Sequence, residues 1–320
     1  MSGTTSRPER VTGASIRVAA ATDVGLKREH NEDHHAVRVL EGDGASAAQV
    51  LLVVSDGMGG SLAGEVASEL AVDTVIERYG ADAAEDHGDG LRHALEGANQ
   101  AVHERSLGDP ALSGMGATCT AAVITEAQAW IAHVGDSRAY LIRQDRIRCL
   151  THDHSLVAQL VERHELDAES ARVDPRRNVV TRSIGYAETV EVDVTREPGL
   201  ARGDTLLLCS DGLHGQISDE EIARISAQHD LERACGDLIR LANDRGGPDN
   251  ITLILARLEG PAATAAPERR ERSGRLRLMI VVLITLLAAV LGAVLWTVLA
   301  MRRTSDRVQR PAHTLEVRVR

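Results

Sequence analysis

Short apolar runs recur along residues 16–258, and most of them are bounded by glycine, proline or aspartate. Such runs are typical of buried β-strands, and several follow one another after short breaks, as in an antiparallel meander. The predicted strands are Ile16–Thr22, Val50–Ser55, Ala117–Thr125, Ala129–Val134, Ala139–Arg143, Val190–Thr195, Thr205–Cys209 and Ile251–Leu258.

Longer segments with apolar residues at helical spacing predict helices. They are Gly64–Arg78, Leu91–Ser106, Ser155–Glu165, Asp219–Ala227 and Leu231–Ala242. Two helices come together early and two come together late, so helices and strands form blocks and do not alternate. This order indicates an α+β domain whose sheets are mainly antiparallel.

Composition narrows the class of protein. Hydrophobic residues make up 43% and charged residues 26%, which excludes global disorder, a collagen-like repeat and a polytopic membrane protein. Aromatic residues make up only 2%, so exposed rings that could stack nucleic-acid bases are scarce. The four cysteines form no CxxC pair and are expected to be reduced thiols in a cytosolic compartment.

Charge is distributed unevenly between the two parts of the chain. Residues 1–260 carry a net charge of −18, and residues 261–320 carry +7. An acidic body disfavours nucleic-acid binding, and no nucleic-acid partner is expected. It also suits a site that gathers divalent cations, although solubility is the commoner reason for such a charge.

The C-terminal part contains an uncharged run at residues 278–301. Its 24 residues would exceed the bilayer core of roughly 30 Å as a helix, whereas a buried core helix is usually shorter and has a polar face. Arginines flank both ends, so the positive-inside rule decides little. Because the N-terminus shows no secretory signal, we expect a single-pass protein of the cell membrane with its catalytic domain in the cytoplasm. The expected order is a disordered 1–13, one domain at 14–258, a linker at 259–277, the transmembrane helix and a short basic tail at 302–320.

Four short motifs place acidic residues at the ends of predicted strands. They are DVGLKREHNED (residues 23–33), VVSDGMGG (53–60), LLLCSDGLHG (206–215) and GGPDNITLIL (246–255). Taken singly, each is more often a turn than a ligand set. Their common setting favours a hard-cation site, because buried carboxylates are costly unless they are paired or coordinated. Oxygen donors favour Mg²⁺ or Mn²⁺ over zinc, and two such ions suit displacement at phosphorus.

The motifs together resemble those of the metal-dependent serine/threonine phosphatases of type 2C, in their bacterial form. The resemblance runs from Asp23 to about Leu258, in the family's order. Besides VVSDGMGG it includes SGMGATCTAAV (113–123), HVGDSRAYL (133–141), THDHSLVAQLVERHEL (151–166), RRNVVTRSIG (176–185), CSDGLHGQISDEEI (209–222) and GGPDNIT (246–252). It implies a four-layer α-β-β-α sandwich, in which two antiparallel sheets are flanked by helix pairs.

The resemblance also implies roles for single residues. Asp56 would bridge two Mn²⁺ or Mg²⁺ ions, the Gly57 carbonyl would bind one of them, and Asp211 and Asp249 would complete the other. Asp136 matches the residue for a third, weaker ion, and residues 152–184 match a mobile flap.

Further residues would act beside the metals. Arg28 would hold phosphate oxygens, while Glu32 and Asp33 would orient waters. Met58 stands where animal members of the family have a histidine that is proposed as the general acid. His214 is expected to be a surface residue.

These inferences predict a protein serine/threonine phosphatase in which a water activated by two metals attacks the phosphorus. Its expected partners are phosphoproteins, and by family analogy a membrane serine/threonine kinase that it opposes. Two alternatives stay open, namely a non-catalytic phosphoprotein-binding module and a phosphatase that acts on a sigma-factor antagonist.

Overall fold

The computed structural model describes residues 11–13, 16–40, 49–59, 62–81, 86–125, 128–228 and 230–259. The chain divides into two units, residues 1–263 and 264–320. The predicted membrane segment 278–301 and the tail 302–320 lie outside the described residues, as does the predicted linker beyond residue 259. Among the residues that are described, no helix has the length and apolar character needed to cross a bilayer.

The first sheet brings together strands from both ends of the domain. Its order is β1 (Val11–Gly13), β2 (Ile16–Asp23), β12 (Ile251–Leu258), β11 (Thr205–Cys209), β8 (Arg138–Arg143) and β9 (Arg146–Cys149). Every neighbouring pair is antiparallel. The last strand therefore lies between the second strand and β11, and the acidic motifs at their ends meet at one edge.

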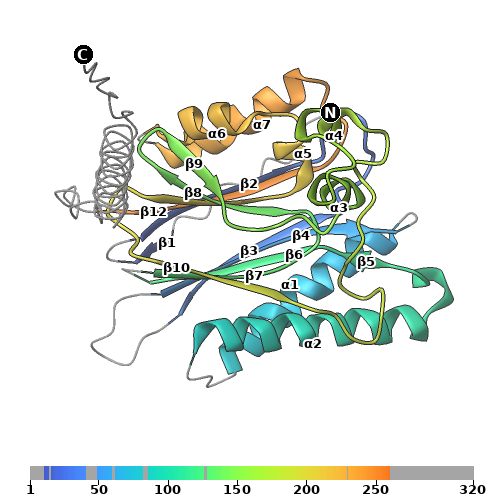
Figure 1. Ribbon diagram of the computed structural model, residues 1–320. Helices are drawn as coiled ribbons and strands as arrows, with labels where there is room; N and C mark the ends of the chain where they lie inside the picture. Colours follow the sequence, from blue (N-terminus) through green and yellow to red (C-terminus); the bar gives the residue numbers. More distant parts are fainter. Residues whose placement is uncertain are drawn as a thin grey trace, which may run out of the picture. The chain divides into compact units, whose positions relative to one another are not determined.

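The second sheet is also antiparallel. Its order is β10 (Asp193–Pro198), β7 (Gln128–Val134), β6 (Cys119–Ile124), β4 (Gln49–Met58) and β3 (Asp33–Leu40), and β5 (Gly116–Ala117) pairs with the end of β4. The two sheets lie face to face (Figure 1).

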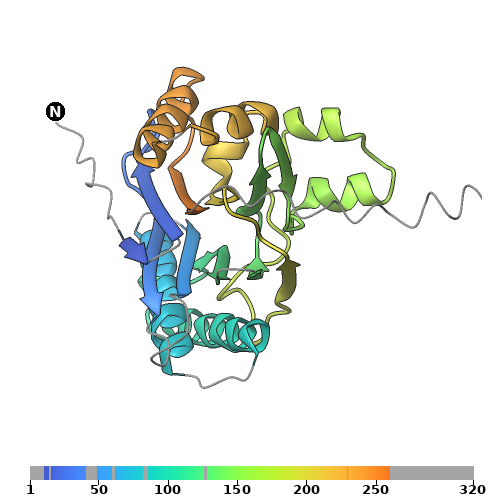
Figure 2. The same cartoon turned by 90° about the vertical axis from the view of Figure 1, so that its left-hand side faces the viewer.

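Helices cover the outer face of each sheet (Figure 1). Helices α1 (Ala63–Ala81) and α2 (His87–Gly108) pack on the second sheet, and η1 (Pro110–Leu112) follows them. Helices α5 (Asp211–His214), α6 (Asp219–Ser226) and α7 (Leu231–Asp244) pack on the first sheet. Two short helices, α3 (Leu156–Glu162) and α4 (Ala168–Val173), stand away from the sheets (Figure 2, yellow-green).

Strand β4 shows why the sequence predicts buried strands here. Val50, Leu52 and Val54 belong to the core between the two sheets. Leu51 and Val53 point the other way, into the core beneath α1 and α2. Since both faces of the strand are buried here, every position from Val50 to Val54 is apolar. The predicted α+β fold with two antiparallel sheets and flanking helices is confirmed.

The structure differs from the prediction where a strand is exposed or interrupted. Strand β3 was not predicted, because it lies at a sheet edge and carries polar residues on its open side. The edge strands β1 and β9 and the short helices α4 and α5 were also not predicted. Residues 11–13 were expected to be disordered, but they pair with β2. The predicted strand 117–125 is divided into β5 and β6 at Thr118.

Candidate active site

The acidic residues of the four motifs meet where the ends of the two sheets approach each other. Asp56 near the end of β4 is paired in register with Asp33 at the start of β3, so the two lie directly opposite each other. Asp211 follows β11 and Asp249 precedes β12, which is the neighbouring strand. A pocket of about 250 Å³ lies among them.

This small pocket contains most of the predicted site. Of the eight predicted residues, seven line it: Arg28, Glu32, Asp56, Gly57, Asp136, Asp211 and Asp249. The eighth, Asp33, is only 7% exposed and does not line the pocket. Met58 and Thr118 also line it, and no histidine does within the part of the chain that the structure describes.

Burial, and then repulsion between neighbouring carboxylates, determines the electrostatics of the pocket. Burial, followed by the charges of Asp33, Asp211 and Asp136, raises the pKa of Asp56 well above its usual value. Burial and the charge of Asp211 raise the pKa of Asp136 to about 8. In the absence of a cation, these carboxyl groups therefore favour their neutral forms near neutral pH.

Asp33 connects the two sheets beneath the pocket. Its Oδ2 accepts a hydrogen bond of 2.7 Å from the hydroxyl of Ser210, which in turn accepts one from the backbone N–H of Thr252. Burial raises the pKa of Asp33 to about 7, although the hydrogen bond from Ser210 opposes the shift. Burial and the charge of Asp249 raise the pKa of Asp211 to about 6.

Arg28 is the cation of the pocket. Its Nη2 donates to Asp249 Oδ2 at 2.8 Å, and its Nη1 lies 3.6 Å from Glu32 Oε2. The side chain remains 45% exposed, so part of its planar donor edge faces solvent. This geometry suits a side chain that receives an anion entering from outside.

Gly57 is required by a close approach of the backbone. A Cβ at this position would lie 2.0 Å from the carbonyl oxygen of Gly64 and 2.7 Å from that of Glu32. The backbone N–H of Gly57 donates to the same Glu32 carbonyl at 3.0 Å. A glycine thus lets the end of β4 pass between the start of α1 and the loop that carries Arg28.

Asn250 is a structural residue of the site that sequence reasoning missed. Its side-chain oxygen accepts from the backbone N–H of Glu32 at 2.7 Å. Its amide donates to the carbonyls of Val24 and His30 at 3.0 and 2.9 Å. One buried amide therefore fixes the Arg28 loop beside Asp249. The only signal in the sequence was its place directly after Asp249.

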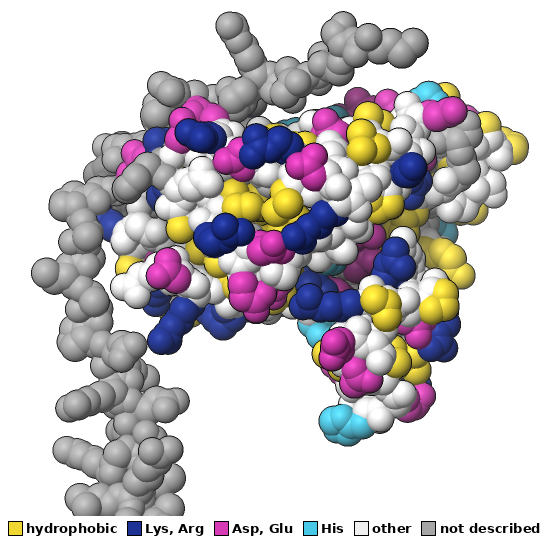
Figure 3. Space-filling view, turned by 90° about the horizontal axis from the view of Figure 1, so that it is seen from above, with side chains coloured by type: hydrophobic (Ala, Val, Ile, Leu, Met, Phe, Trp, Pro, Cys, Tyr) yellow, Lys and Arg dark blue, Asp and Glu magenta, His cyan; other side chains and the backbone are white. Residues whose placement is uncertain are grey.

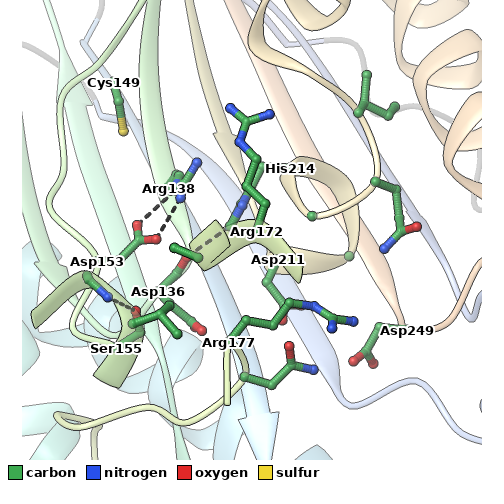
Figure 4. A pocket seen from close by; sticks show the side chains of 18 of the residues that line it. Asp136, Arg138, Cys149, Asp153, Ser155, Arg172, Arg177, Asp211, His214 and Asp249 are labelled. Atoms are coloured by element: carbon green, nitrogen blue, oxygen red, sulfur yellow. Dashed lines mark hydrogen bonds and ion pairs between the residues drawn. The ribbon is translucent and has the colours of Figure 1, made fainter. Parts of the chain in front are cut away.

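His214 was predicted to be a surface residue, and this prediction is wrong. It ends α5, is partly buried, and its Nε2 donates to the backbone carbonyl of Asp136 at 3.0 Å. Burial and the charge of Arg138 lower the pKa of His214 to about 3. The neutral imidazole thus positions the loop that carries Asp136 (Figure 4).

The donors of the pocket fit a hard divalent cation, although they are not yet arranged around one. Within the described ranges, no group of three His, Cys, Asp or Glu side chains is already placed to hold a metal ion. Asp249 is instead engaged by Arg28. However, all the pocket's charged donors are oxygens, and Oδ1 of Asp33 and Oδ1 of Asp211 are buried without a hydrogen-bond partner. Such a set suits Mn²⁺ or Mg²⁺.

A second, larger cleft of about 710 Å³ adjoins the pocket and shares Arg28, Asp136, Asp211 and Asp249 with it. One side is formed by the predicted flap, residues 152–184, which contains α3 and α4. The base of the flap is attached to the sheets. The backbone N–H of His154 donates to the Gly135 carbonyl at 2.7 Å, and that of Thr181 donates to the His154 carbonyl at 2.8 Å.

Comparison with known proteins agrees with this geometry. The family model described as protein phosphatase 2C matches residues 19–251. The chain is 39% identical over 239 residues to serine/threonine phosphatase Stp of Listeria monocytogenes, covering 73% of this chain and 92% of that protein. It is 38% identical over 251 residues to protein phosphatase PhpP of Streptococcus pneumoniae, covering 75% and 96%.

Solved structures resemble the described domain. The serine/threonine phosphatase PstP/Ppp of Mycobacterium tuberculosis superposes with a TM-score of 0.69 at 35% identity, covering 77% of this chain and 100% of that one. A PstP catalytic domain solved with two manganese ions superposes with a TM-score of 0.67 at 34% identity, covering 77% and 99%.

Proposed function

Because the chain belongs to the protein phosphatase 2C family, we propose that it hydrolyses phosphoserine and phosphothreonine through a two-metal centre. It is a metal-dependent phosphoprotein phosphatase that takes Mn²⁺ or Mg²⁺. The observation that carries this proposal is the convergence of buried carboxylates from both sheets on one pocket. Asp56, Asp211, Asp249 and the backbone carbonyl of Gly57 would hold the ions.

Two bound divalent ions would lower the pKa of water enough for attack on phosphorus near neutral pH and would offset the charge on the phosphoryl oxygens. The protein's own groups supply the rest. Arg28 would donate from the solvent-facing part of its guanidinium to the phosphoryl group and hold that group in line. Glu32 and Asp33 would accept hydrogen bonds from water and so orient it.

Asp136 would provide an additional, weaker ion site. It lines the same pocket, and the charge of Asp211 acts on it. His214 would act as a positioning residue, since it holds the Asp136 backbone and does not line the small pocket.

We further propose that the enzyme is attached to the cell membrane by residues 278–301, with the domain in the cytoplasm, and that it opposes a membrane serine/threonine kinase. The support is the uncharged run of 24 residues with arginines on both sides. A tether would raise the effective concentration of the enzyme toward partners on the same surface.

A phosphothreonine peptide tests the catalytic proposal. The full chain with Mn²⁺ should release phosphate, lose this activity in excess chelator and recover it when Mn²⁺ is restored. Asp249→Asn should abolish the activity with the fold intact, because a full charge is removed from the ligand set. Asp244→Asn, an exposed carboxylate of α7 outside the pocket, is the matched control. Full activity in chelator, or in Asp249→Asn, would exclude the two-metal proposal.

The non-catalytic alternative makes the opposite prediction. A phosphoprotein-binding module would retain the phosphopeptide without releasing phosphate. The set of carboxylates in one pocket disfavours it, because a phosphate-binding module has no need for several buried acids beside its anion.

A further inference from the structure

The larger cleft beside the catalytic pocket is built from two walls. Helices α3 and α4 of the flap form one wall, and the chain from α5 to the start of α6 forms the other. Figure 3 shows a recess between the body and the projecting segment, with Lys and Arg side chains near it. Neither α3 nor α4 has a buried residue, so this wall presents its side chains to whatever enters the cleft.

Several charged groups of the cleft neutralise each other. Arg138 forms a two-pronged ion pair with Asp153, at 2.8 and 2.7 Å. Arg245 pairs with Glu221 at 2.7 Å. Arg138 and Arg245 are therefore already ion-paired within the protein.

Two flap arginines in the cleft have no such partner. Within the described residues, Arg172 and Arg177 form no ion pair, and both side chains are exposed. Arg176, between them in sequence, does not line the cleft and is held by Asp174 through two contacts of 2.9 Å. The flap therefore carries unpaired arginines on the side that faces the cleft.

The two arginines lie at different places along the cleft (Figure 4). The charge of Arg177 acts on Asp211, at the catalytic pocket. The charge of Arg172 acts on His214 and on Glu220, at the start of α6. Arg172 thus lies beyond the catalytic carboxylates, where a neighbouring part of the substrate would lie once its phosphate is at Arg28.

We propose that Arg172 is a specificity-determining residue that binds an anionic side chain of the phosphoprotein, near the scissile phosphothreonine or phosphoserine. This inference rests on the proposed function. Guanidinium groups bind carboxylates and phosphates through paired donors. The anion is an Asp or Glu side chain or a second phosphorylated residue, which share this chemistry.

The charge of the whole protein makes such a contact useful. The chain has a net charge of −11, and residues 1–260 carry −18, so an acidic peptide is repelled by the body as it approaches. An unpaired cation in the cleft reverses this repulsion locally. The same peptide without its acidic residue would gain nothing from Arg172.

The test measures kcat/KM on phosphothreonine peptides that carry one Glu at successive positions around the phosphorylated residue. A neutral peptide, a doubly phosphorylated peptide and a peptide with Lys complete the series. The wild type should prefer the best acidic peptide over the neutral one by about tenfold, which is about 1.4 kcal/mol. Arg172→Ala should bring this ratio close to one, and Arg172→Glu should favour the Lys peptide.

Two controls separate specificity from catalysis. Arg176→Ala removes an arginine of the same segment outside the cleft and should keep the wild-type ratio. Turnover of a small phosphate ester should be unchanged in Arg172→Ala, because the ester does not reach this residue. If the wild type prefers both the Glu peptide and the doubly phosphorylated peptide, Arg172 binds anionic side chains in general. If it prefers only the doubly phosphorylated peptide, the group that Arg172 binds is a second phosphate.

The two failures can be told apart. If no peptide is hydrolysed in the presence of Mn²⁺, the proposed function itself is wrong. If peptides are hydrolysed without acidic preference, or if the preference persists in Arg172→Ala, the proposed function stands and the role of Arg172 is overturned.

Discussion

In the absence of divalent cations, the free energy of unfolding of the protein should fall as the pH rises from 6.5 to 8. Burial and neighbouring carboxylates raise the pKa of Asp136 to about 8 and that of Asp56 well above its usual value of 3.8. In the unfolded chain both groups are ionised throughout this window. In the metal-free folded protein they stay neutral until the pH approaches their raised pKa values, so their contribution to stability is present at low pH and is lost as the pH rises.

The magnitude follows from the linkage between protonation and folding. As the pH rises toward the pKa of such a group in the folded protein, the free energy of unfolding falls by about 1.4 kcal/mol for each pH unit. Asp136 alone therefore removes up to about 2 kcal/mol between pH 6.5 and 8, since its pKa lies at the end of the window. For a domain of this size, 2 kcal/mol corresponds to a fall in Tm of about 4–8 °C.

The buried histidines change the stability with pH in the opposite direction. Burial lowers the pKa of His133 and of His214 to about 3, and that of His35 to about 4. These groups lower the stability as the pH falls below their ordinary value of 6.5. Above pH 6.5 their protonation in the unfolded chain falls away, so this opposing slope fades toward pH 8, and it is the same in the wild type and in Asp136→Asn.

The assay is urea unfolding of the full chain in excess chelator at several pH values between 6.5 and 8. Asp136→Asn should flatten the fall by about 2 kcal/mol, because the amide does not titrate. Asp244→Asn, on the surface of α7, should keep the wild-type slope. With Mn²⁺ the stabilisation should increase with pH, since ligands bind the ion in their deprotonated form. Equal slopes for the metal-free wild type and Asp136→Asn would refute the argument.

Four further predictions concern the scaffold and the substrate. Gly57→Ala should lower the unfolding free energy by more than about 2 kcal/mol in urea titrations, because its Cβ would lie 2.0 Å from the Gly64 carbonyl oxygen. Asn250→Ala should cost about 2–4 kcal/mol in the same assay, since one buried backbone donor and two carbonyls lose their partner. Arg28→Ala should raise KM for a phosphopeptide more than it lowers kcat in steady-state kinetics. A chain truncated after residue 258 should keep its turnover of a small phosphate ester, and a folded but inactive product would place the remainder of the chain in the site.

The sequence was most informative where both faces of an element are buried. The predicted bounds of β11 and β12 match the structure, because apolar side chains enter the cores on both sides and aspartates mark the ends. The same aspartates allowed the site to be predicted, because the ends of neighbouring strands are close in space even when they are far apart in the sequence. Strand β3 was missed because an edge strand with one open face has no continuous apolar signal.

The supporting residues could not be predicted, because their roles depend on contacts between distant parts of the chain. Asn250 binds groups 218 to 226 positions earlier in the sequence, and His214 holds the Asp136 loop 78 positions away. Arg172 has no distinguishing neighbour in sequence. Its difference from Arg176 is visible only once the structure shows which of the two is paired and which lines the cleft.

The polar bridge beneath the pocket explains how the site can be both precise in position and costly in stability. Ser210 donates to Asp33 at 2.7 Å and accepts from the backbone of Thr252, so β3 of one sheet is joined to β11 and β12 of the other. The relative position of the sheets, and hence of Asp56 and Asp211, is fixed by this buried contact as well as by the core between them. The scaffold thereby holds together carboxylates whose pKa values are raised by burial and by neighbouring negative charges. A divalent cation at this point relieves the repulsion, so binding of the ion and stability of the junction between the sheets are expected to be linked.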